Sequence, residues 1–305
     1  MTEEENCQMW DFVVVVVTWN VKALVQGCLD SLFDDRSAPS FKAVVVDNAS
    51  SDGTAAWVTQ NYPAVDTISN GLNLGFSAAN NQAISKYRGQ ARYFVLLNPD
   101  TLVQPDALRR MLCFLNSHPE AGIVGGKVVK PDGALDWPCK RSFQTPEVFF
   151  CRALALDRLF PWSRRFGRHH LTYLDENQTH EVDAVTGAFL AIRGETVDQI
   201  GLLDEELKLY SEDMDWCHRA KNAGWKVFYY PEASVIHLKS SSSKQNSGFA
   251  LYWWYRSTWM VYRRYMAPRY PWPVNALIYG GLKGLYGLSI LRQWAGRGGR
   301  LPSRR

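Results

Sequence analysis

A chain of 305 residues, 46% of them hydrophobic, can bury one large core or two modest ones. Its net charge of +4 is unevenly distributed, because twelve of the 34 Lys and Arg residues follow Glu232 and no acidic residue does. Residues 1–232 carry 22 basic and 30 acidic residues. This predicts a mildly acidic domain, which is not expected to bind polyanions, followed by a basic tail.

The six cysteines are scattered, without a CxxC pair or another spacing typical of metal ligands. They are Cys7, Cys28, Cys113, Cys139, Cys151 and Cys217. Such cysteines are expected to be buried thiols in a reducing compartment. The N-terminus is acidic where a signal peptide would be basic, and the valine run at residues 13–17 is too short for a signal core. We therefore expect a cytoplasmic domain.

The first part of the chain alternates between strand and helix patterns. A continuous β-branched run at residues 12–18 is typical of a strand buried on both faces of a parallel sheet, and an apolar-periodic stretch at residues 23–33 follows it. This alternation predicts an α/β fold with a doubly wound, mostly parallel sheet. The pattern repeats at residues 43–46 and 54–60, 65–68 and 77–86, and 93–97 and 106–115.

Each of the four predicted strands ends in polar residues. In doubly wound sheets ligands bind beyond the carboxyl ends of the strands, so these residues are expected to form one rim. A rim rich in Asp, Asn and Gly suits the base, ribose and diphosphate of a nucleotide. The four strand ends are residues 18–20, 47–53, 70–76 and 98–100.

The pattern divides the chain into four parts. Residues 1–130 form the nucleotide-binding half. Residues 131–181 lose periodicity among Pro, aromatic and Arg residues, which predicts an irregular, substrate-shaping insertion. Residues 182–238 are a second structured block, expected to serve the acceptor and catalysis, and residues 239–305 are the C-terminal basic, aromatic tail.

Asp100 is the best-placed ligand for a divalent cation. The chain has neither GxGxxG nor GxxxxGKS/T, so neither a dinucleotide cofactor nor a P-loop is supported. A nucleoside diphosphate bound without a P-loop lysine usually needs Mg²⁺ or Mn²⁺ to neutralise its charge, and a carboxylate is a hard oxygen ligand for either ion. In the alternative interpretation Asp100 only caps a turn after Pro99.

Three acidic residues begin a predicted helix at Ser211, which is a favourable N-cap residue. Asp213 is a candidate general base, because a sugar hydroxyl must lose its proton to a carboxylate as the new bond forms. In the alternative interpretation these acids only complement the helix dipole, and Asp215 pairs with Arg219 four residues further on.

His237 follows a short apolar stretch at residues 233–236 and precedes Lys239 and four serines. A single histidine is more often structural than a ligand. A metal ligand beside a flexible loop can, however, couple substrate binding to loop closure, so His237 is the second candidate metal ligand.

These segments also occur, in this order, in a known family. The chain resembles family 2 glycosyltransferases of the GT-A fold, especially the rhamnosyltransferase-like bacterial branch, over roughly residues 12–238. An ordered set is far more specific than any one motif. The matching segments are residues 17–20 (VTWN), 46–54 (VDNASSDGT), 73–80 (NLGFSAAN), 96–101 (LLNPDT), 186–188 (TGA) and 210–215 (YSEDMD), ending at His237.

The resemblance implies an inverting, single-displacement transfer with Asp213 as the general base and Glu212 as the alternative. It assigns the metal to Asp100, although Asn98 replaces the first carboxylate of the family's Asp-X-Asp motif. Because one carboxylate is missing, His237 and the donor's diphosphate become more important as metal ligands. The implied donor-binding residues, of which Asp47 binds the pyrimidine, are Thr18, Asn20, Asp47, Asn73, Gly75, Asn80, Asn98, Gly187 and Ala188.

The favoured hypothesis is transfer of rhamnose from dTDP-rhamnose to a cell-surface glycan or lipid-linked acceptor, with a UDP-sugar as the alternative donor. A processive polysaccharide synthase is disfavoured, because the Gln-x-x-Arg-Trp segment and the several membrane spans that such synthases share are missing. The alternative from another class is a non-catalytic module that binds membrane or polyanions through the tail.

The tail favours a membrane surface over nucleic acid, for which no recognised motif is present. Residues 247–305 contain five Trp among many Tyr and Arg, a composition typical of the headgroup layer of anionic membranes. Residues 274–291 are apolar but include Asn275, Lys283 and four glycines, which favours an interfacial helix over a transmembrane span. We expect a peripheral protein on the inner face of the cell membrane; packing of the tail on the domain or homodimerisation are the alternatives.

Overall fold

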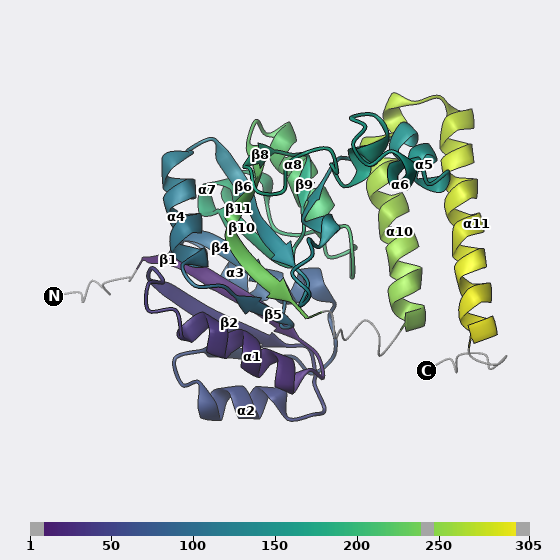
Figure 1. The fold of residues 1–305 in the computed structure, drawn as a ribbon. Coiled ribbons are helices and arrows are strands. Elements are labelled where there is room, and N and C mark those ends of the chain that lie inside the picture. The colour runs from purple at the N-terminus through teal and green to yellow at the C-terminus, as the bar shows by residue number, and fades with distance from the viewer. Residues whose placement is uncertain (1–8, 239–246, 297–305) are drawn as a thin grey trace.

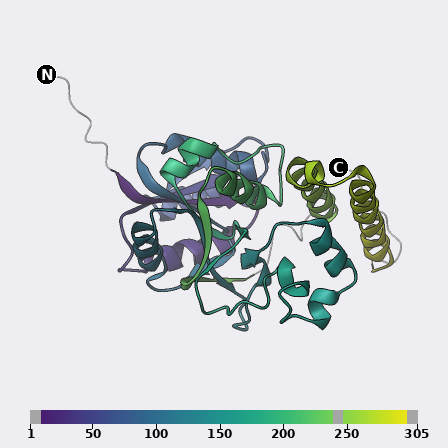
Figure 2. The ribbon, with the colours of Figure 1, turned by 90° about the horizontal axis from the view of Figure 1, so that it is seen from above.

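The computed structural model describes residues 9–238 and 247–296. Its centre is a nine-stranded sheet in which eight strands follow the order β3-β2-β1-β4-β10-β6-β11-β5 and β8 pairs with β11. Helices cover the sheet, and two long C-terminal helices, α10 (Ser247–Tyr265) and α11 (Trp272–Gly296), lie side by side at one side of the body (Figures 1 and 2). The predicted α/β class is confirmed.

The four strand-helix units predicted for the first half are present. The side chains of residues 12–16 in β1 are fully buried, as expected for an inner strand of a sheet that is covered on both faces. Parallel pairing aligns Thr18 with Asp47, which brings two of the polar strand ends together. The units are β1 (Trp10–Thr18) and α1 (Lys22–Phe33), β2 (Phe41–Asp47) and α2 (Thr54–Asn61), β3 (Asp66–Ser69) and α3 (Phe76–Lys86), and β4 (Ala91–Leu97) with α4 (Ala107–Ser117) further on.

The sheet is parallel up to β4 and mixed beyond it. β10 pairs antiparallel with both β4 and β6, and β11 pairs parallel with β6 and antiparallel with β5. The β5–β11 pairing sets His237 opposite Thr101, immediately after the Asn-Pro-Asp turn. The elements of this half are β5 (Thr101–Val103), β6 (Ala121–Val129), β9 (Ala184–Val185), β10 (Phe189–Arg193), α7 (Gly194–Ile200), α8 (Glu212–Asn222) and β11 (Lys226–His237).

The segment predicted as irregular contains several short elements. Its main helix, α5, begins after Thr145, whose side chain accepts a hydrogen bond from the Val148 amide, and Pro146 occupies the first turn. These are ordinary helix-start signals. The elements are η1 (Trp137–Cys139), β7 (Lys140–Arg141), α5 (Pro146–Ala153), α6 (Leu156–Leu159), η2 (Phe166–His169) and β8 (His180–Glu181).

Helix α10 packs on the sheet domain. Val261 is buried in the main hydrophobic core, and Ser257 donates a hydrogen bond to the Leu209 carbonyl at 2.9 Å. The Tyr265 ring stacks on His218 with 4.2 Å between the ring centroids. Helix α10 of the predicted tail therefore packs into the body, while residues 239–246 and 297–305 of that tail lie outside the described residues.

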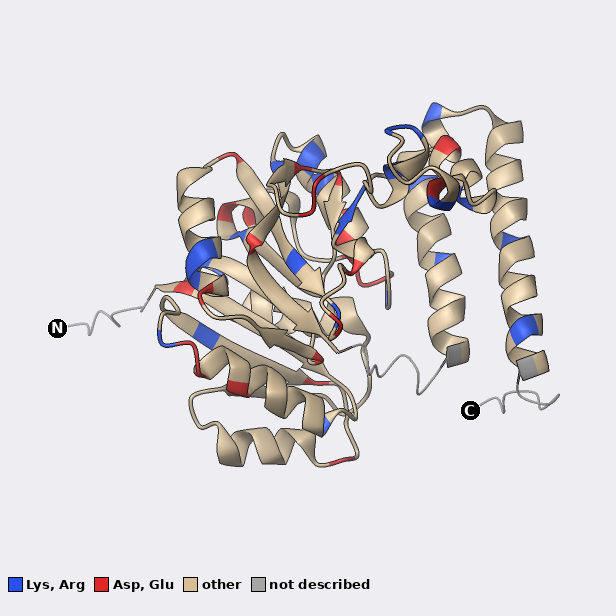
Figure 3. Cartoon of the chain, viewed as in Figure 1, with Lys and Arg blue, Asp and Glu red and all other residues tan. Residues whose placement is uncertain are grey.

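Helix α11 packs against α10 and α5 and exposes its other side. Ile278 and Leu282 are buried in a small cluster with Tyr262 and Met266. Within the 24 residues Trp272–Ala295, an 18-residue window has a mean hydropathy of 1.2 and is 11% buried, so this helix is long and apolar enough to cross a membrane by length and composition. The sequence had favoured an interfacial helix instead. Figure 3 shows basic and no acidic positions along α10 and α11.

Candidate active site

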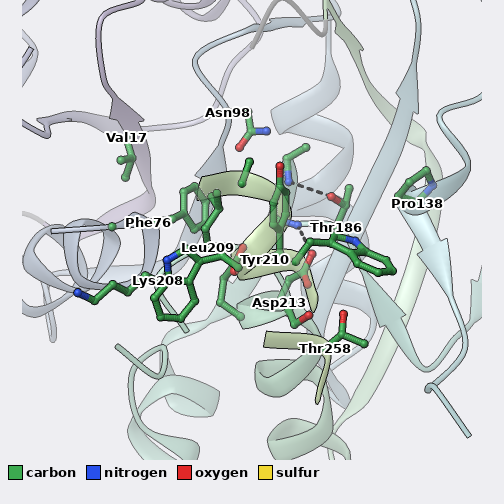
Figure 4. Close-up of a pocket in the computed structure, with 18 of the residues that line it drawn as sticks. Val17, Phe76, Asn98, Pro138, Thr186, Lys208, Leu209, Tyr210, Asp213 and Thr258 are labelled. Atoms are coloured by element: carbon green, nitrogen blue, oxygen red, sulfur yellow. Dashed lines mark hydrogen bonds between the residues drawn. The ribbon is translucent and has the colours of Figure 1, made fainter. Parts of the chain in front are cut away.

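A cavity of about 1060 Å³ lies at the carboxyl ends of β1 and β4. Thr18 ends β1 and Asn98 follows β4, while Gly187 and Asp213 come from the second structured block. The insertion and α10 complete the wall, and Figure 4 shows Asn98, Thr186, Asp213 and Thr258 around the same space. Such a volume is at the upper end of small-molecule sites and accommodates a nucleotide sugar.

The first corner of the cavity pairs Asp100 with His237. The turn before Asp100 is fixed because the Asn98 amide donates to the Ala188 carbonyl at 3.0 Å and the Thr101 hydroxyl donates to the Asn98 carbonyl at 2.6 Å. His237 Nε2 lies 3.1 Å from Asp100 Oδ1. This explains why two residues 137 positions apart meet: the turn leads into β5, and β5 pairs with the end of β11.

Asp136 is a third member of this corner, and no motif in the sequence pointed to it. Its Oδ2 lies 3.3 Å from His237 Nδ1, so the imidazole stands between two carboxylates. Burial lowers the pKa of His237, but hydrogen bonds and charges from Asp100 and Asp136 outweigh burial and raise this pKa to about 9. A carboxylate that accepts from the far nitrogen of a histidine is the usual support of a metal-ligating histidine.

The corner fits a metal that is held largely by its substrate. Asp100 and His237 offer one carboxylate and one imidazole, and within residues 9–238 and 247–296 no group of three His, Cys, Asp or Glu is arranged to hold a metal ion. Mg²⁺ in phosphate-transfer sites is typically bound by one or two protein carboxylates together with substrate phosphates. Two protein ligands of this kind would hold a divalent metal only when a diphosphate completes its coordination.

The second corner holds Asp213 in the first turn of α8. Its Oδ2 accepts from Arg141 at 2.6 Å and from the Gly187 amide at 3.0 Å, and its Oδ1 accepts from the Met214 amide at 2.7 Å. Ser211 occupies the predicted N-cap position, but with φ of 66° its side chain makes no capping hydrogen bond. The carboxylate is thus oriented by the strand and loop facing the helix, at a site only 6% exposed.

Glu212, the alternative base, is in a different environment. It is buried and its Oε2 has no hydrogen-bond partner among the described residues. Burial, and then the charge of Asp213, raise the pKa of Glu212 from 4.5 to about 8. A carboxyl group in this state is protonated at neutral pH and is a poor proton acceptor, so the geometry favours Asp213 over Glu212.

Glu212→Gln is expected to change how stability depends on pH. A folded-state pKa above the unfolded value means that the contribution of Glu212 to stability is fully present below pH 4.5 and is lost as the pH rises toward about 8. Gln mimics the neutral acid and removes this loss, so the variant should become the more stable protein above pH 8, by at least about 1 kcal/mol. Urea unfolding across this pH range measures the difference, and parallel curves for both proteins would contradict the shifted pKa.

Six of the nine predicted donor-binding residues line the cavity: Thr18, Asn73, Gly75, Asn98, Gly187 and Ala188. Asn20, Asp47 and Asn80 do not. Asp47 accepts hydrogen bonds from the Ser50 amide and hydroxyl, and Asn20 accepts one from the Ser51 amide, so both shape the loop after β2. Asn80 donates to the Phe76 carbonyl one turn earlier in α3. Asn20 and Asp47 lie at the strand ends, whereas Asn80 lies within α3, and each side chain hydrogen-bonds to neighbouring groups of the chain.

Other residues of the cavity were not found from the sequence. They come from the insertion and from α10, where no motif stands out and no periodicity points to a site. Their common property is charge or aromatic character, which the sequence had assigned to substrate shaping or to membrane contact. They include Asp136, Arg141, Arg152, His169, His170, Trp253 and Trp254.

A nucleotide-sized cavity at the strand ends, with a carboxylate-imidazole pair at one corner and a fixed carboxylate at the other, defines a transferase of the nucleotide-sugar type. Residues 10–255 match the model of the family described as glycosyltransferase-like family 2. The chain therefore belongs to glycosyltransferase family 2 and is a glycosyltransferase, as the sequence motifs had indicated.

Two relatives and one solved structure illustrate the likeness. The chain is 28% identical over 260 residues to N-acetylglucosaminyl-diphospho-decaprenol L-rhamnosyltransferase of Mycobacterium tuberculosis, covering 81% of this chain and 82% of the relative. It is 24% identical over 271 residues to rhamnosyltransferase WbbL of Escherichia coli, covering 83% and 92%. Mannosyltransferase PcManGT of Pyrobaculum calidifontis, solved with GDP-Man and Mn²⁺, matches with a TM-score of 0.56 at 16% identity, over 96% of this chain and 77% of that one. That likeness confirms the predicted fold.

Proposed function

We propose that this chain is an inverting glycosyltransferase that moves a sugar, with rhamnose from dTDP-rhamnose favoured, onto a lipid-linked saccharide. The observation that carries the proposal is that Asp213 and the Asp100–His237 pair line one cavity. Rhamnose as the transferred sugar and a diphosphate-linked acceptor are supported by the names of relatives whose alignments cover more than four fifths of this chain. A UDP-sugar is the competing donor.

In the proposed reaction an acceptor hydroxyl attacks the anomeric carbon of the donor sugar, and the bond from this carbon to the diphosphate oxygen breaks. Asp213 takes the hydroxyl proton, while Arg141 and the Gly187 amide hold its carboxylate in place. Attack from the face opposite the leaving diphosphate inverts the anomeric carbon. A divalent metal held by Asp100 and His237 would neutralise the departing diphosphate.

A donor screen tests the function. The wild-type protein with Mn²⁺ is incubated with dTDP-rhamnose, UDP-N-acetylglucosamine and GDP-mannose, and donor binding and slow donor hydrolysis are measured. We expect binding and hydrolysis with dTDP-rhamnose above the other two. If no donor binds and none is hydrolysed, the proposed activity is wrong; preference for a UDP-sugar would replace rhamnose as the transferred group.

Metal binding is expected to depend on the donor diphosphate. Mn²⁺ titrated into the protein alone should bind weakly, and dTDP should tighten binding at least about tenfold, because two protein ligands leave most coordination positions to other groups. Asp136→Asn should weaken Mn²⁺ binding in the presence of dTDP by about 10- to 100-fold, since Asp136 orients His237.

Calorimetric titration measures these affinities, and Asp132→Asn, an exposed carboxylate of the same segment, is the matched control. Tight Mn²⁺ binding without dTDP, or equal affinities for the Asp136 and Asp132 variants, would show that the metal is not held at this corner.

We further propose that α11 lies along an anionic membrane at the cytoplasmic face. Its inner side packs on α10 at more than one point along the helix. The Tyr279 and Trp259 rings lie 4.8 Å apart between centroids, and the Tyr286 and Tyr255 rings lie 5.4 Å apart. A helix packed in this way cannot cross a bilayer without carrying the Arg-bearing α10 into it, which favours an in-plane position with the exposed side in the lipid.

Replacing three exposed leucines of α11 by glutamate, Leu277→Glu, Leu288→Glu and Leu291→Glu together, is expected to abolish binding to phosphatidylglycerol vesicles. Each leucine contributes about 1.5–3 kcal/mol when transferred from water to lipid, and glutamate adds repulsion from the anionic surface. Leu72→Glu, at a leucine 62% exposed on the sheet domain, is the control. Vesicle flotation is the measurement, and undiminished flotation of the triple variant would refute the proposed orientation.

A further inference from the structure

Four basic or imidazole side chains gather on the insertion side of the cavity. Arg141, Arg152, His169 and His170 all line it, and we refer to them as the basic cluster. Arg141 lies on β7, Arg152 on α5, and the two histidines end η2 and follow it. The donor, metal and base assignments use none of these residues as a ligand, apart from the contact of Arg141 with Asp213.

Several nitrogen atoms of the basic cluster have no hydrogen-bond partner in the part of the chain that the structure describes. Among the described residues no carboxylate pairs with Arg152, whose guanidinium contacts the His169 ring and lies 5.6 Å from the centroid of the Trp254 ring. Arg141 Nε, His169 Nδ1 and His170 Nδ1 are buried and lack any hydrogen-bond partner in the described chain. Buried polar nitrogens without a partner are costly unless a ligand completes them.

Both histidines are held in the neutral form, chiefly by burial and in addition by nearby positive charge. Burial, and then the charges of Arg152 and Arg141, lower the pKa of His170 to about 3. The pKa of His169, which is only 6% exposed, is also lowered well below its usual value by burial first and then by Arg152. Neutral imidazoles beside two guanidinium groups form a site that an anion would stabilise.

The position of the cluster assigns it to the acceptor side. Arg141 touches Asp213, and the base must reach the acceptor hydroxyl, whereas the donor diphosphate belongs at the Asp100–His237 corner. Trp253 and Trp254 of α10 continue the wall of the cavity from the cluster.

Exposed apolar side chains lie beyond that wall. Phe150 and Leu154, which are 43% and 65% exposed, come from α5 and the residue after it, and α11 packs beside α5. Figure 2 shows α5 and α6 next to the pair formed by α10 and α11. A ligand with a charged head in the cavity and an apolar tail on this surface fits the arrangement.

We propose that the basic cluster binds the diphosphate of a lipid-linked sugar acceptor. This inference rests on the proposed transferase function and adds to it the group by which the acceptor is recognised. Arg152 contributes charge-assisted hydrogen bonds to the diphosphate, the histidine nitrogens left unpartnered within the described residues border it, and the Trp254 face holds the guanidinium in place.

The test compares two acceptors that differ in the diphosphate. One is N-acetylglucosaminyl diphosphate esterified to a short prenol, and the other is octyl N-acetylglucosaminide, which carries no phosphate. Arg152→Gln should weaken calorimetric binding of the diphosphate acceptor, and raise its KM, by about 10- to 100-fold, the loss typical of a hydrogen bond to a charged group. Arg152→Lys should recover part of it. Binding of the octyl glycoside and of dTDP should not change, and Arg158→Gln, on the neighbouring α6, should behave as wild type.

Three results would overturn the inference: equal losses for both acceptors, a loss of dTDP affinity in place of acceptor affinity, or unchanged diphosphate binding in a folded Arg152→Gln protein. Circular dichroism establishes that each variant is folded, and Arg152→Lys serves if the Gln variant is not. Failure of the transferase proposal is distinguishable, because it appears in the wild type as absent donor binding and hydrolysis, while acceptor binding is measured without donor.

Discussion

Asp213→Asn is expected to lower kcat/KM by about 10²- to 10⁴-fold, the usual contribution of a positioned general base. Asn has almost the same shape as Asp, and its one carbonyl oxygen can still accept from either the Gly187 or the Met214 amide, which bind different oxygens of the native carboxylate. The variant should therefore fold and bind dTDP as the wild type does, and lose only the ability to take the acceptor proton. Initial rates of sugar transfer with saturating donor measure the effect.

Glu212→Gln is the matched control, because it makes the same chemical change at the adjacent residue. A protonated Glu212 takes no part as base, so this variant should keep most of the activity. If Glu212→Gln is inactive and Asp213→Asn is active, the roles are reversed. If both variants bind donor and acceptor as the wild type does and no protein transfers sugar, the chain is a non-catalytic binding module.

The strand-helix units of the first half could be predicted because their physical signal is local. A run such as residues 12–18 is apolar along its whole length only when both faces are covered, and each following helix shows its own periodicity. The same rule about strand ends placed Thr18 and Asn98 at one cavity before any pairing was known.

The rest of the sheet depends on pairing between distant segments. β10 enters between β4 and β6 in the antiparallel sense, which no pattern within residues 189–193 specifies. Gly125 in β6 shows the constraint after folding, since a Cβ there would lie 2.4 Å from the Val185 Cβ. A glycine required by close packing is not distinguishable in one sequence from a glycine in a loop.

The same distinction between local signals and distant contacts applies to the site residues. Asp100, Asp213 and His237 were identified because they belong to motifs, whereas Asp136 and Arg141 reach the cavity from a segment without one. The basic, aromatic composition of the C-terminal residues favoured a membrane surface, but α10 uses part of that composition to close the cavity and to pack on α8. Composition does not reveal which of two surfaces an aromatic residue contacts.

Asp215→Ala is expected to destabilise the protein by about 3–5 kcal/mol, the range for removing one partner of a buried ion pair. Asp215 is fully buried, and its oxygens accept from Arg219 Nε at 2.8 Å, from Arg264 at 2.6 Å and from the Tyr265 hydroxyl at 2.8 Å. Arg219 lies on α8, as the i,i+4 pattern predicted, while Arg264 and Tyr265 lie on α10. Removing the carboxylate leaves Arg219 without its ion-pair partner and Arg264 with Asp204 as its remaining partner.

Asp198→Ala is the control, because its ion pair with Arg88 is exposed and should contribute only about 0–1 kcal/mol. Urea unfolding of both variants measures the difference, and equal losses would show that the buried network adds no stability.

The network also joins α8, which carries Asp213, to α10, which carries Trp253 and Trp254 of the cavity wall. In Asp215→Ala we therefore expect acceptor KM to rise more than dTDP affinity falls, since α10 borders the acceptor side and the donor corner is built by β4, β5 and β11.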